Sequence, residues 1–377
     1  MHTDWSEVRV RRLARHFLLD RAPAGKLVGV VGGVCGIHAQ VLTAGELSLG
    51  IRVNGITRTD VRRALWEERS LVKTWGVRGT VHLYPAGEVA MWVAAARASG
   101  REQDQRRLKF LGITPALLET LIEEAGRAVD GRRLTLKELG AELVRRLPWS
   151  AEHASTAFGA GSWPKWRVGV GHAAGRGLLV FGPNRGPEVT FVSPREWLGG
   201  WPRVDVDAAV VEVLRRYLRT YGPSTANEFA QWLAIHPRRA RAALAEIAGE
   251  LEEVEVEGEP RLDLPGEPAK ARRSVRLLPH FDAYLRGFHP RRELTAGHAE
   301  RSAGGTGQAP VLLVDGMVAG VWQRQAKGRR MQVRVDTFVK LSKAQLAELE
   351  GEARRVSAFD GMEADLSLGP VRVRAHL

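Results

Sequence analysis

The amino-acid sequence predicts an α+β protein in which groups of helices alternate with β-hairpins. The first observation is a repeat. Thr135 and Glu138 open one apolar stretch with helical spacing, and Thr225 and Glu228 open another. A threonine followed three residues later by a glutamate is a capping box, which is typical of a helix N-terminus. The second observation is that a hairpin pattern comes after each of these helices. Together they predict repeated units of helices and paired strands.

The stretch around Thr225 predicts a complete unit over residues 203–260. A helix over residues 207–220 precedes it, and a basic helix begins after it at Pro237. Residues 251–258 then alternate between polar and apolar side chains, as a half-buried strand does. Three helices followed by a strand pair is the winged-helix pattern.

The copy around Thr135 predicts a second winged-helix unit over residues 113–202. A helix capped by Thr114 is expected to run to about Val129, and a third helix is expected over residues 152–174. A hairpin with a turn rich in Gly and Pro is expected between residues 178 and 192.

A looser copy predicts a further winged-helix unit over residues 1–112. Here Thr59 is expected to cap a helix over residues 60–69, and two strands are expected on either side of Gly76 and Gly79. The sequence therefore predicts three winged-helix units in tandem.

A linker is expected over residues 259–273, and a β-rich C-terminal domain over residues 270–377. A capped helix from Ser342 is expected within this domain. The strands are expected at residues 274–279, 311–314, 318–322, 331–335 and about 370–374.

The charge of the chain points to a polyanionic partner. The 377 residues include 56 Lys and Arg against 43 Asp and Glu, which gives a formal net charge of +13. A field of this sign attracts nucleic acid.

Cys35 is the only cysteine, which excludes an internal disulfide and a zinc site made of cysteines. No segment is apolar enough to predict a membrane span. We expect a cytoplasmic monomer that acts at the nucleoid without a metal or cofactor.

These features alone favour a winged-helix transcriptional regulator without catalysis, because helices and wings explain DNA affinity and nothing more. A nuclease would need metal-ligand motifs such as HExxH, which the chain lacks. Asp282 is expected to be a turn or cap carboxylate.

His38 and Gln40 stand two residues apart after a glycine-rich apolar stretch, so their side chains share one side if the backbone is extended. A lone histidine of this kind is ordinarily a hydrogen-bonded core residue.

Five stretches resemble, in the same order, the AlkZ/YcaQ family of bacterial winged-helix DNA glycosylases, and they extend over nearly the whole chain. The stretches are Gly33 to Gln40, Leu71 to Leu83, Tyr221 to Thr225, Leu278 to Leu285, and Asp315 to Trp322. The resemblance implies a C-shaped protein with a basic DNA-binding cleft that removes alkylated bases from double-stranded DNA.

Members of this family carry a catalytic Gln-x-Gln motif, and here His38 stands at the first position and Gln40 at the second. This pattern is similar to the His-x-Gln branch, which is associated with self-resistance to bulky, intercalating antibiotics that alkylate guanine N7. The resemblance implies a monofunctional DNA glycosylase that excises such adducts and leaves an abasic site. It favours single-site adducts over interstrand crosslinks.

The roles expected for the two catalytic residues follow from the substrate. An N7-alkylguanine is already positively charged and departs as a neutral base, so no general acid is needed. His38 is expected to orient or deprotonate the attacking water, and Gln40 to fix that water through its amide carbonyl. With an ordinary imidazole pKa, the rate would fall below a pH of about 6.5. The expected DNA contacts are Lys73, Arg78, Lys165, Arg167, Arg238, Arg239, Arg241, Lys327, Arg329 and Arg330.

Overall fold

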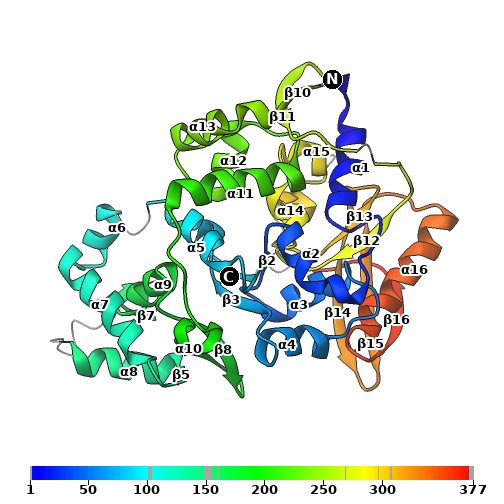
Figure 1. Cartoon of the computed structure of the whole chain (residues 1–377). Coiled ribbons are helices and arrows are strands. Elements are labelled where there is room, and N and C mark those ends of the chain that lie inside the picture. Colours follow the sequence, from blue (N-terminus) through cyan, green and yellow to red (C-terminus); the bar gives the residue numbers. More distant parts are fainter. Residues whose placement is uncertain are drawn as a thin grey trace.

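The computed structural model describes residues 2–100, 104–147, 155–158, 161–267, 269–295, 297–305 and 308–372. Helices and small sheets alternate along the chain (Figure 1), which confirms the predicted α+β class. Three of the sheets have three strands each, and in each of them a hairpin is joined by a short strand from earlier in the chain.

The first of these sheets has the strand order β2-β4-β3 and lies among the N-terminal helices. Thr57, not Thr59, caps helix α4, because the Asp60 carboxylate accepts a hydrogen bond from the Thr57 backbone N–H at 2.8 Å. The capping box therefore lies two residues earlier than expected. The elements are α1 (Trp5–Arg15), α2 (Leu27–Gly33), β2 (Ile37–His38), α3 (Leu42–Gly50), α4 (Arg58–Trp66), β3 (Leu71–Trp75), β4 (Val81–Pro85) and α5 (Val89–Arg97).

The second sheet has the order β5-β9-β8 and follows the Thr135 helix, whose capping box is present as predicted. The helix expected over residues 152–174 is wrong in its first half. Strands β6 and β7 lie there, and the helix begins only at Arg167, because Gly161 and Pro164 disfavour a helix. Residues 152–154 and 159–160 lie outside the described residues. The elements are α6 (Gln105–Phe110), α7 (Pro115–Ala128), β5 (Leu134–Thr135), α8 (Leu136–Arg146), β6 (Ser155–Phe158), β7 (Gly161–Pro164), α9 (Arg167–Gly175), β8 (Val180–Arg185), β9 (Glu188–Val192) and α10 (Pro194–Leu198).

The third sheet brings together the first strand of the chain and a hairpin that ends at Asp263. Strand β1 (His2–Thr3) pairs in parallel with β10 (Glu252–Val256), which forms a hairpin with β11 (Glu259–Asp263). The linker expected from residue 259 therefore begins after β11. The predicted helices are present as α11 (Val206–Tyr221), α12 (Ala226–Leu233) and α13 (Pro237–Glu246), and α12 has the predicted capping box at Thr225.

The C-terminal region is built on a five-stranded sheet of order β12-β13-β14-β15-β16, in which β15 and β16 are parallel. The final strand expected at about residues 370–374 is wrong. The strand lies at residues 363–368, where it pairs with β15 and ends before Gly369 and Pro370; residues 373–374 are outside the described part. The elements are β12 (Val275–Leu278), α14 (Ala283–Gly287), α15 (Arg292–Thr295), β13 (Val311–Val314), β14 (Met317–Lys327), β15 (Arg330–Thr337), α16 (Lys343–Ala358) and β16 (Glu363–Leu368).

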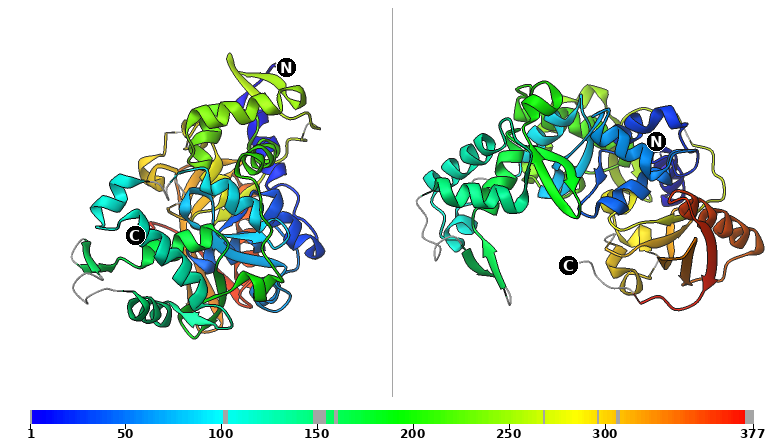
Figure 2. Two further views of the ribbon diagram at one scale, coloured as in Figure 1. Left: turned by 60° about the vertical axis from the view of Figure 1, so that its left-hand side comes forward. Right: turned by 90° about the horizontal axis from the view of Figure 1, so that it is seen from below.

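Seen from below, the ribbon is arched (Figure 2). The helices around α7 form one end, the C-terminal sheet with α16 forms the other, and the β2-β4-β3 sheet lies between them. Among the described residues, no helix combines the length and apolarity needed to cross a membrane.

A buried ion pair joins the N-terminal helices to the C-terminal region. Both nitrogens at the end of the Arg52 side chain donate to the Asp282 carboxylate at 2.7 Å, and both side chains are fully buried. Asp282 also accepts from Ser48 Oγ and from the Tyr284 backbone N–H, where it caps α14. This confirms the cap role predicted for Asp282.

Replacing Arg52 by leucine should lower the free energy of unfolding by about 3–5 kcal/mol, because it leaves the Asp282 charge buried without its partner. The control is Arg63→Ala, which removes solvent-exposed ion pairs with Asp60 and Glu68 and should change the free energy of unfolding far less than Arg52→Leu does. Urea denaturation followed by circular dichroism measures both. Equal, small losses in the two variants would contradict the structural role given to Arg52.

Candidate active site

His38 ends the short edge strand β2, and Gln40 lies two residues beyond it in a bend. His38 is paired with His82 of β4, and the Ala39 backbone N–H donates to the Val81 carbonyl at 2.7 Å. The next ladder position is filled by a side chain, because the Gln40 carbonyl oxygen accepts from the Val81 N–H at 3.3 Å. This hydrogen bond holds the Gln40 amide in place while the backbone leaves the sheet to begin α3.

Gly45 allows α3 to pack directly on this strand. A Cβ atom at Gly45 would lie only 2.9 Å from the His38 carbonyl oxygen. His38 is 6% exposed, and its ring packs between two other rings, with centroid distances of 4.7 Å to Phe281 and 5.2 Å to His82. Its Nδ1 is enclosed and has no partner among the described residues, so Nε2 is the ring nitrogen that remains accessible.

The surroundings of His38 keep its imidazole neutral. Burial, followed by the positive charges of Arg286 and Arg78, lowers the pKa of His38 from its ordinary value to about 3. Burial also lowers the pKa of His82 well below its ordinary range. A loss of activity near pH 6.5 is therefore not expected from His38, contrary to the expectation from the sequence.

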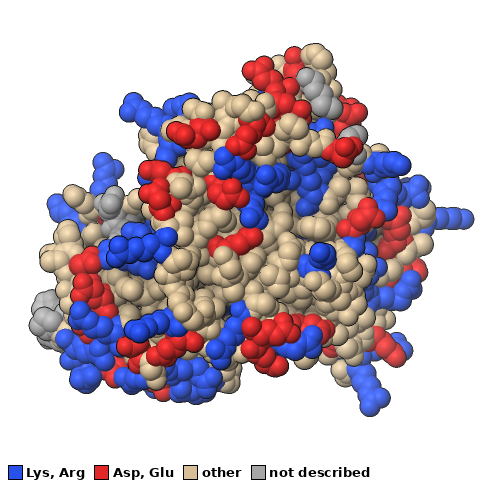
Figure 3. Space-filling view, in the orientation of Figure 1, with Lys and Arg blue, Asp and Glu red and all other residues tan. Residues whose placement is uncertain are grey.

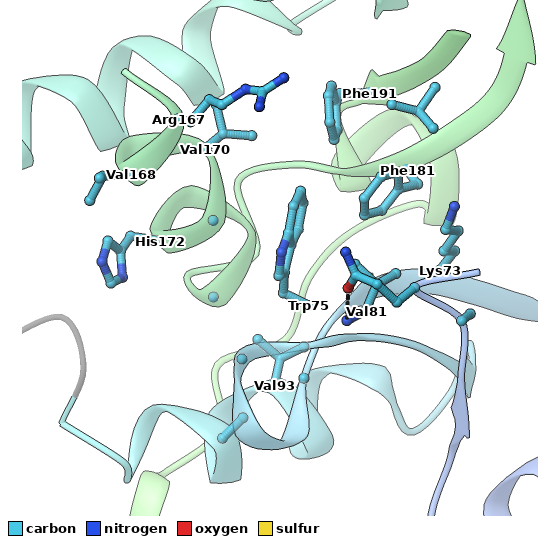
Figure 4. Close-up of a pocket in the computed structure, with 18 of the residues that line it drawn as sticks. Lys73, Trp75, Val81, Val93, Arg167, Val168, Val170, His172, Phe181 and Phe191 are labelled. Atoms are coloured by element: carbon cyan, nitrogen blue, oxygen red, sulfur yellow. Dashed lines mark hydrogen bonds between the residues drawn. The ribbon is translucent and has the colours of Figure 1, made fainter. Parts of the chain in front are cut away.

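A cavity of about 560 Å³ opens beside Gln40. It lies between the β3–β4 hairpin, helices α5 and α9, and the β8–β9 hairpin (Figure 4). Aromatic side chains form one wall, and no described lining residue is a carboxylate. The cavity wall includes Ala39 and Gln40 but not His38, which contacts Phe281 and His82 instead. The lining residues that carry aromatic or basic groups are Lys73, Trp75, Arg97, Arg167, His172, Phe181 and Phe191.

Two of the expected DNA contacts are not surface charges. Lys73 is 5% exposed, with its ammonium 4.5 Å from the Phe181 ring centroid, and burial lowers its pKa to about 8. Arg78 is half-buried in the β3–β4 turn with a left-handed φ of 61°, and it donates to the Trp232 carbonyl at 3.0 Å. Both residues therefore lie close to the His38 strand.

The remaining expected contacts lie apart from one another. Lys165 and Arg239 are half-buried, and Arg239 forms an ion pair with Asp207. Figure 3 shows Lys and Arg on this face in several groups among acidic residues rather than in one continuous patch. Six of the expected DNA contacts are exposed: Arg167 beside the cavity, Arg238 and Arg241 on α13, and Lys327, Arg329 and Arg330 at the β14–β15 hairpin.

The comparisons with known proteins identify the family. A family model for AlkZ-like DNA glycosylases matches residues 31–359. The chain belongs to the AlkZ-like DNA glycosylase family. It is 30% identical, over 99% of its length and 100% of the relative's, to an interstrand DNA cross-link repair glycosylase from Streptomyces sahachiroi. The solved structure of the S. sahachiroi DNA glycosylase AlkZ matches it with a TM-score of 0.81 and 29% identity, over 98% of this chain and 100% of that one.

This AlkZ-like chain is accordingly a DNA glycosylase that acts in DNA repair, with DNA as its substrate. The alternative of a regulator without catalysis is set aside by this result. Among the residues described, no group of three His, Cys, Asp or Glu side chains is arranged to hold a metal ion.

Sequence reasoning missed three residues of this site. His82 and Phe281 contact the His38 ring, and Trp75 forms the aromatic wall of the cavity. His82 and Trp75 lie within the strand pair that was recognised, and Phe281 precedes the buried Asp282. The period-two pattern of β3 and β4 could have indicated which side chains share a face with His38, but not that Phe281 covers it.

The lowered pKa of His38 should make the protein less stable in acid. Below its ordinary pKa of about 6.5 the unfolded chain takes up a proton that the folded site rejects, so stability is lost as the pH falls from about 7 to about 5. His38 alone should contribute a loss of about 2 kcal/mol at pH of about 5. His38→Gln removes this contribution, so urea unfolding should show a smaller loss in the variant. An equal loss in both proteins would contradict the buried, neutral imidazole.

Proposed function

We propose that this glycosylase excises bulky N7-alkylguanine adducts of an intercalating genotoxic antibiotic, leaves an abasic site, and protects the organism that makes the genotoxin. The observation that carries the proposal is the chemistry of the site. A neutral imidazole at the end of β2 and a carboxamide two residues later stand together, and the carboxamide lines a roomy cavity without a described carboxylate. Such a site suits a base that needs little help to leave.

The substrate supplies the charge that the protein does not. A guanine alkylated at N7 is a cation, and breaking its glycosidic bond releases a neutral base and an oxocarbenium-like sugar. A general acid is unnecessary, and a strong base is also unnecessary, because water attacks an already cationic carbon. The charged groups that act on His38, Arg286 and Arg78, are both positive. The negative charge that stabilises the sugar therefore comes from the DNA phosphates.

In this mechanism His38 orients the attacking water and does not deprotonate it. With a pKa of about 3, the His38 imidazole is too weak a base to take up a proton from water at neutral pH. Its accessible Nε2 can still accept a hydrogen bond. Gln40 holds the water through its carbonyl oxygen, which uses one lone pair on the Val81 N–H and has a second one free. The proton then passes to solvent.

We also propose how the duplex is bound. The three small sheets and their helices, over residues 1–112, 113–202 and 203–260, are winged-helix units, and with the domain over residues 270–377 they form a C-shaped monomer around the DNA. The exposed basic residues contact phosphates, together with Arg78, Lys165 and Arg239. The arched ribbon and the net charge of +13 support this arrangement.

The substrate that we propose differs from the one in the name of the S. sahachiroi relative. That protein is described as a glycosylase for interstrand crosslinks. This chain has histidine where the family motif begins with glutamine, and we propose single-site adducts as its substrates.

His38→Ala and Gln40→Ala should each lower the single-turnover rate of base release by about 10²- to 10⁴-fold, because each removes a group that positions the water. Binding to adducted duplex, measured by fluorescence anisotropy, should stay unchanged. His2→Ala, at an exposed histidine paired with Glu255, is the control and should keep the full rate.

The assay incubates the protein with adducted duplex in EDTA and then cleaves abasic sites with hot alkali. Strand breaks that need the alkali treatment are the expected result. Strand breaks before alkali, or no release of any N7-alkylguanine, would contradict the proposed function. Full rates in the His38 and Gln40 variants would leave the glycosylase in place but remove these residues from its mechanism.

A further inference from the structure

A second hollow, the α3 groove, begins at the residue after Gln40. It has a volume of about 910 Å³ and is bordered by the start of α3, by the C-terminal sheet and by the chain after β16. We propose that the α3 groove binds the phosphate backbone of the strand that carries the adduct, immediately beside the excised nucleotide. DNA is the substrate of the family, and the position of the adduct at His38 and Gln40 rests on the proposed function. The polar residues that line the groove are Thr43, His280, Gln323, Arg324, Arg334 and Arg372.

The α3 groove and the cavity beside Gln40 are lined by consecutive residues. Ala39 and Gln40 line the cavity, and Val41 lines the groove together with Thr43 and Ala44 at the start of α3. A nucleotide whose sugar faces Gln40 therefore has its neighbours in the same strand within reach of the groove. Seen from below, the chain after β16 (red) runs toward the opening of the arch (Figure 2), so this border of the groove lies where a duplex would enter.

The charge of the α3 groove is positive. Its lining residues include His280, Arg324, Arg334 and Arg372 and no described carboxylate. Arg324 forms an ion pair with Asp360 at 2.6 Å, so its charge is balanced within the protein. Arg334 and Arg372 are exposed, and neither forms an ion pair with a residue that the structure describes. Their two guanidinium groups are therefore available for phosphates, which arginine binds through paired hydrogen bonds.

Gly369 brings the last described residues close to Arg334. The Gly369 N–H donates to the Val335 carbonyl at 2.9 Å, which continues the pairing of β16 with β15. A Cβ atom at this glycine would lie only 2.9 Å from a terminal nitrogen of Arg334. The chain can therefore turn closely over the Arg334 side chain, and residues 370–372, which follow, all line the groove.

The remaining lining residues are mostly apolar. They include Leu47, Pro279, Pro310 and Trp322. The Trp322 indole N–H donates to the Leu278 carbonyl at 2.9 Å, so it is not available to a ligand. An apolar surface bordered by arginines suits a nucleic-acid backbone, because the arginines bind the phosphates and the apolar surface can contact the sugars.

The test uses a duplex that binds without being cleaved, in which 7-methylguanine is attached to 2′-fluoroarabinose instead of deoxyribose. Each phosphate near the lesion is replaced, one at a time and on either strand, by an uncharged methylphosphonate. Dissociation constants are measured by fluorescence anisotropy. Neutralising a phosphate next to the lesion, on one side of it and in the adducted strand, should weaken binding by about fivefold to tenfold.

Arg334→Gln and Arg372→Gln should each weaken binding by a similar factor. Each should also reduce the slope of log K against log salt concentration by about 0.9, as expected for one lost phosphate contact. In these variants the methylphosphonate at the contacted position should have no further effect, because the contact is already lost. The matched control is Arg354→Gln, at an exposed arginine of α16 outside the groove, which should change neither the affinity nor the slope.

Thr43→Glu tests the groove from its other border. Thr43 is exposed in the first turn of α3, where a carboxylate stabilises a helix, so the variant should fold normally. The negative charge should weaken binding at least as much as Arg334→Gln does. Thr43→Gln, which has the same size and no charge, should have little effect.

Additive effects of Arg334→Gln and of every methylphosphonate would overturn the proposal, and so would coupling to the complementary strand alone. Equal binding by Thr43→Glu and Thr43→Gln would also overturn it. Release of 7-methylguanine from the ordinary deoxyribose duplex is measured alongside. If the wild-type protein releases no base but shows the coupling, the proposed function fails and the groove stands. If it releases the base without the coupling, only the groove proposal fails.

Discussion

The buried pair of Arg52 and Asp282 is the interaction on which the geometry of the site depends. The two residues are 230 positions apart in the chain, yet their side chains are fully buried against each other in bidentate contact. Arg52 follows α3, the helix that packs on the His38 strand, and Asp282 follows Phe281, whose ring covers the His38 ring. One ion pair therefore fixes the relative positions of β2, of α3 behind it and of the Phe281 ring that covers His38.

The electrostatics of the site are consistent with a substrate that carries its own charge. Arg78 and Arg286 act on a histidine that is already buried, and both disfavour its protonation. The cavity next to it has basic and aromatic groups and no described carboxylate. A site of this kind would be poor at protonating a leaving group or at deprotonating water strongly. It is suited to placing a neutral acceptor beside a sugar whose base is already prepared to leave.

The sequence predicted those parts of the fold that short-range chemistry determines. The capping boxes at Thr135 and Thr225, the helix cap at Ser342 and the β3–β4 and β8–β9 hairpins were predicted because their signals lie within a few residues of one another. The cap of α4 was misplaced by two residues because Thr57 and Thr59 both precede the helix pattern. The strand order, including the pairing of β1 with β10, depends on contacts between distant segments and could not be predicted.

The candidate site shows the same division. His38 and Gln40 were found through a resemblance, but the pKa of His38 depends on burial and on two arginines from other segments. The most direct measurement is a crystal structure of the protein with a duplex that carries a cationic 1-azadeoxyribose in place of the reacting sugar, bound with free 7-methylguanine. We expect a water held by His38 Nε2 and the Gln40 side-chain carbonyl, within hydrogen-bond distance of the sugar nitrogen. A sugar bound away from both side chains, or held by a carboxylate, would contradict it.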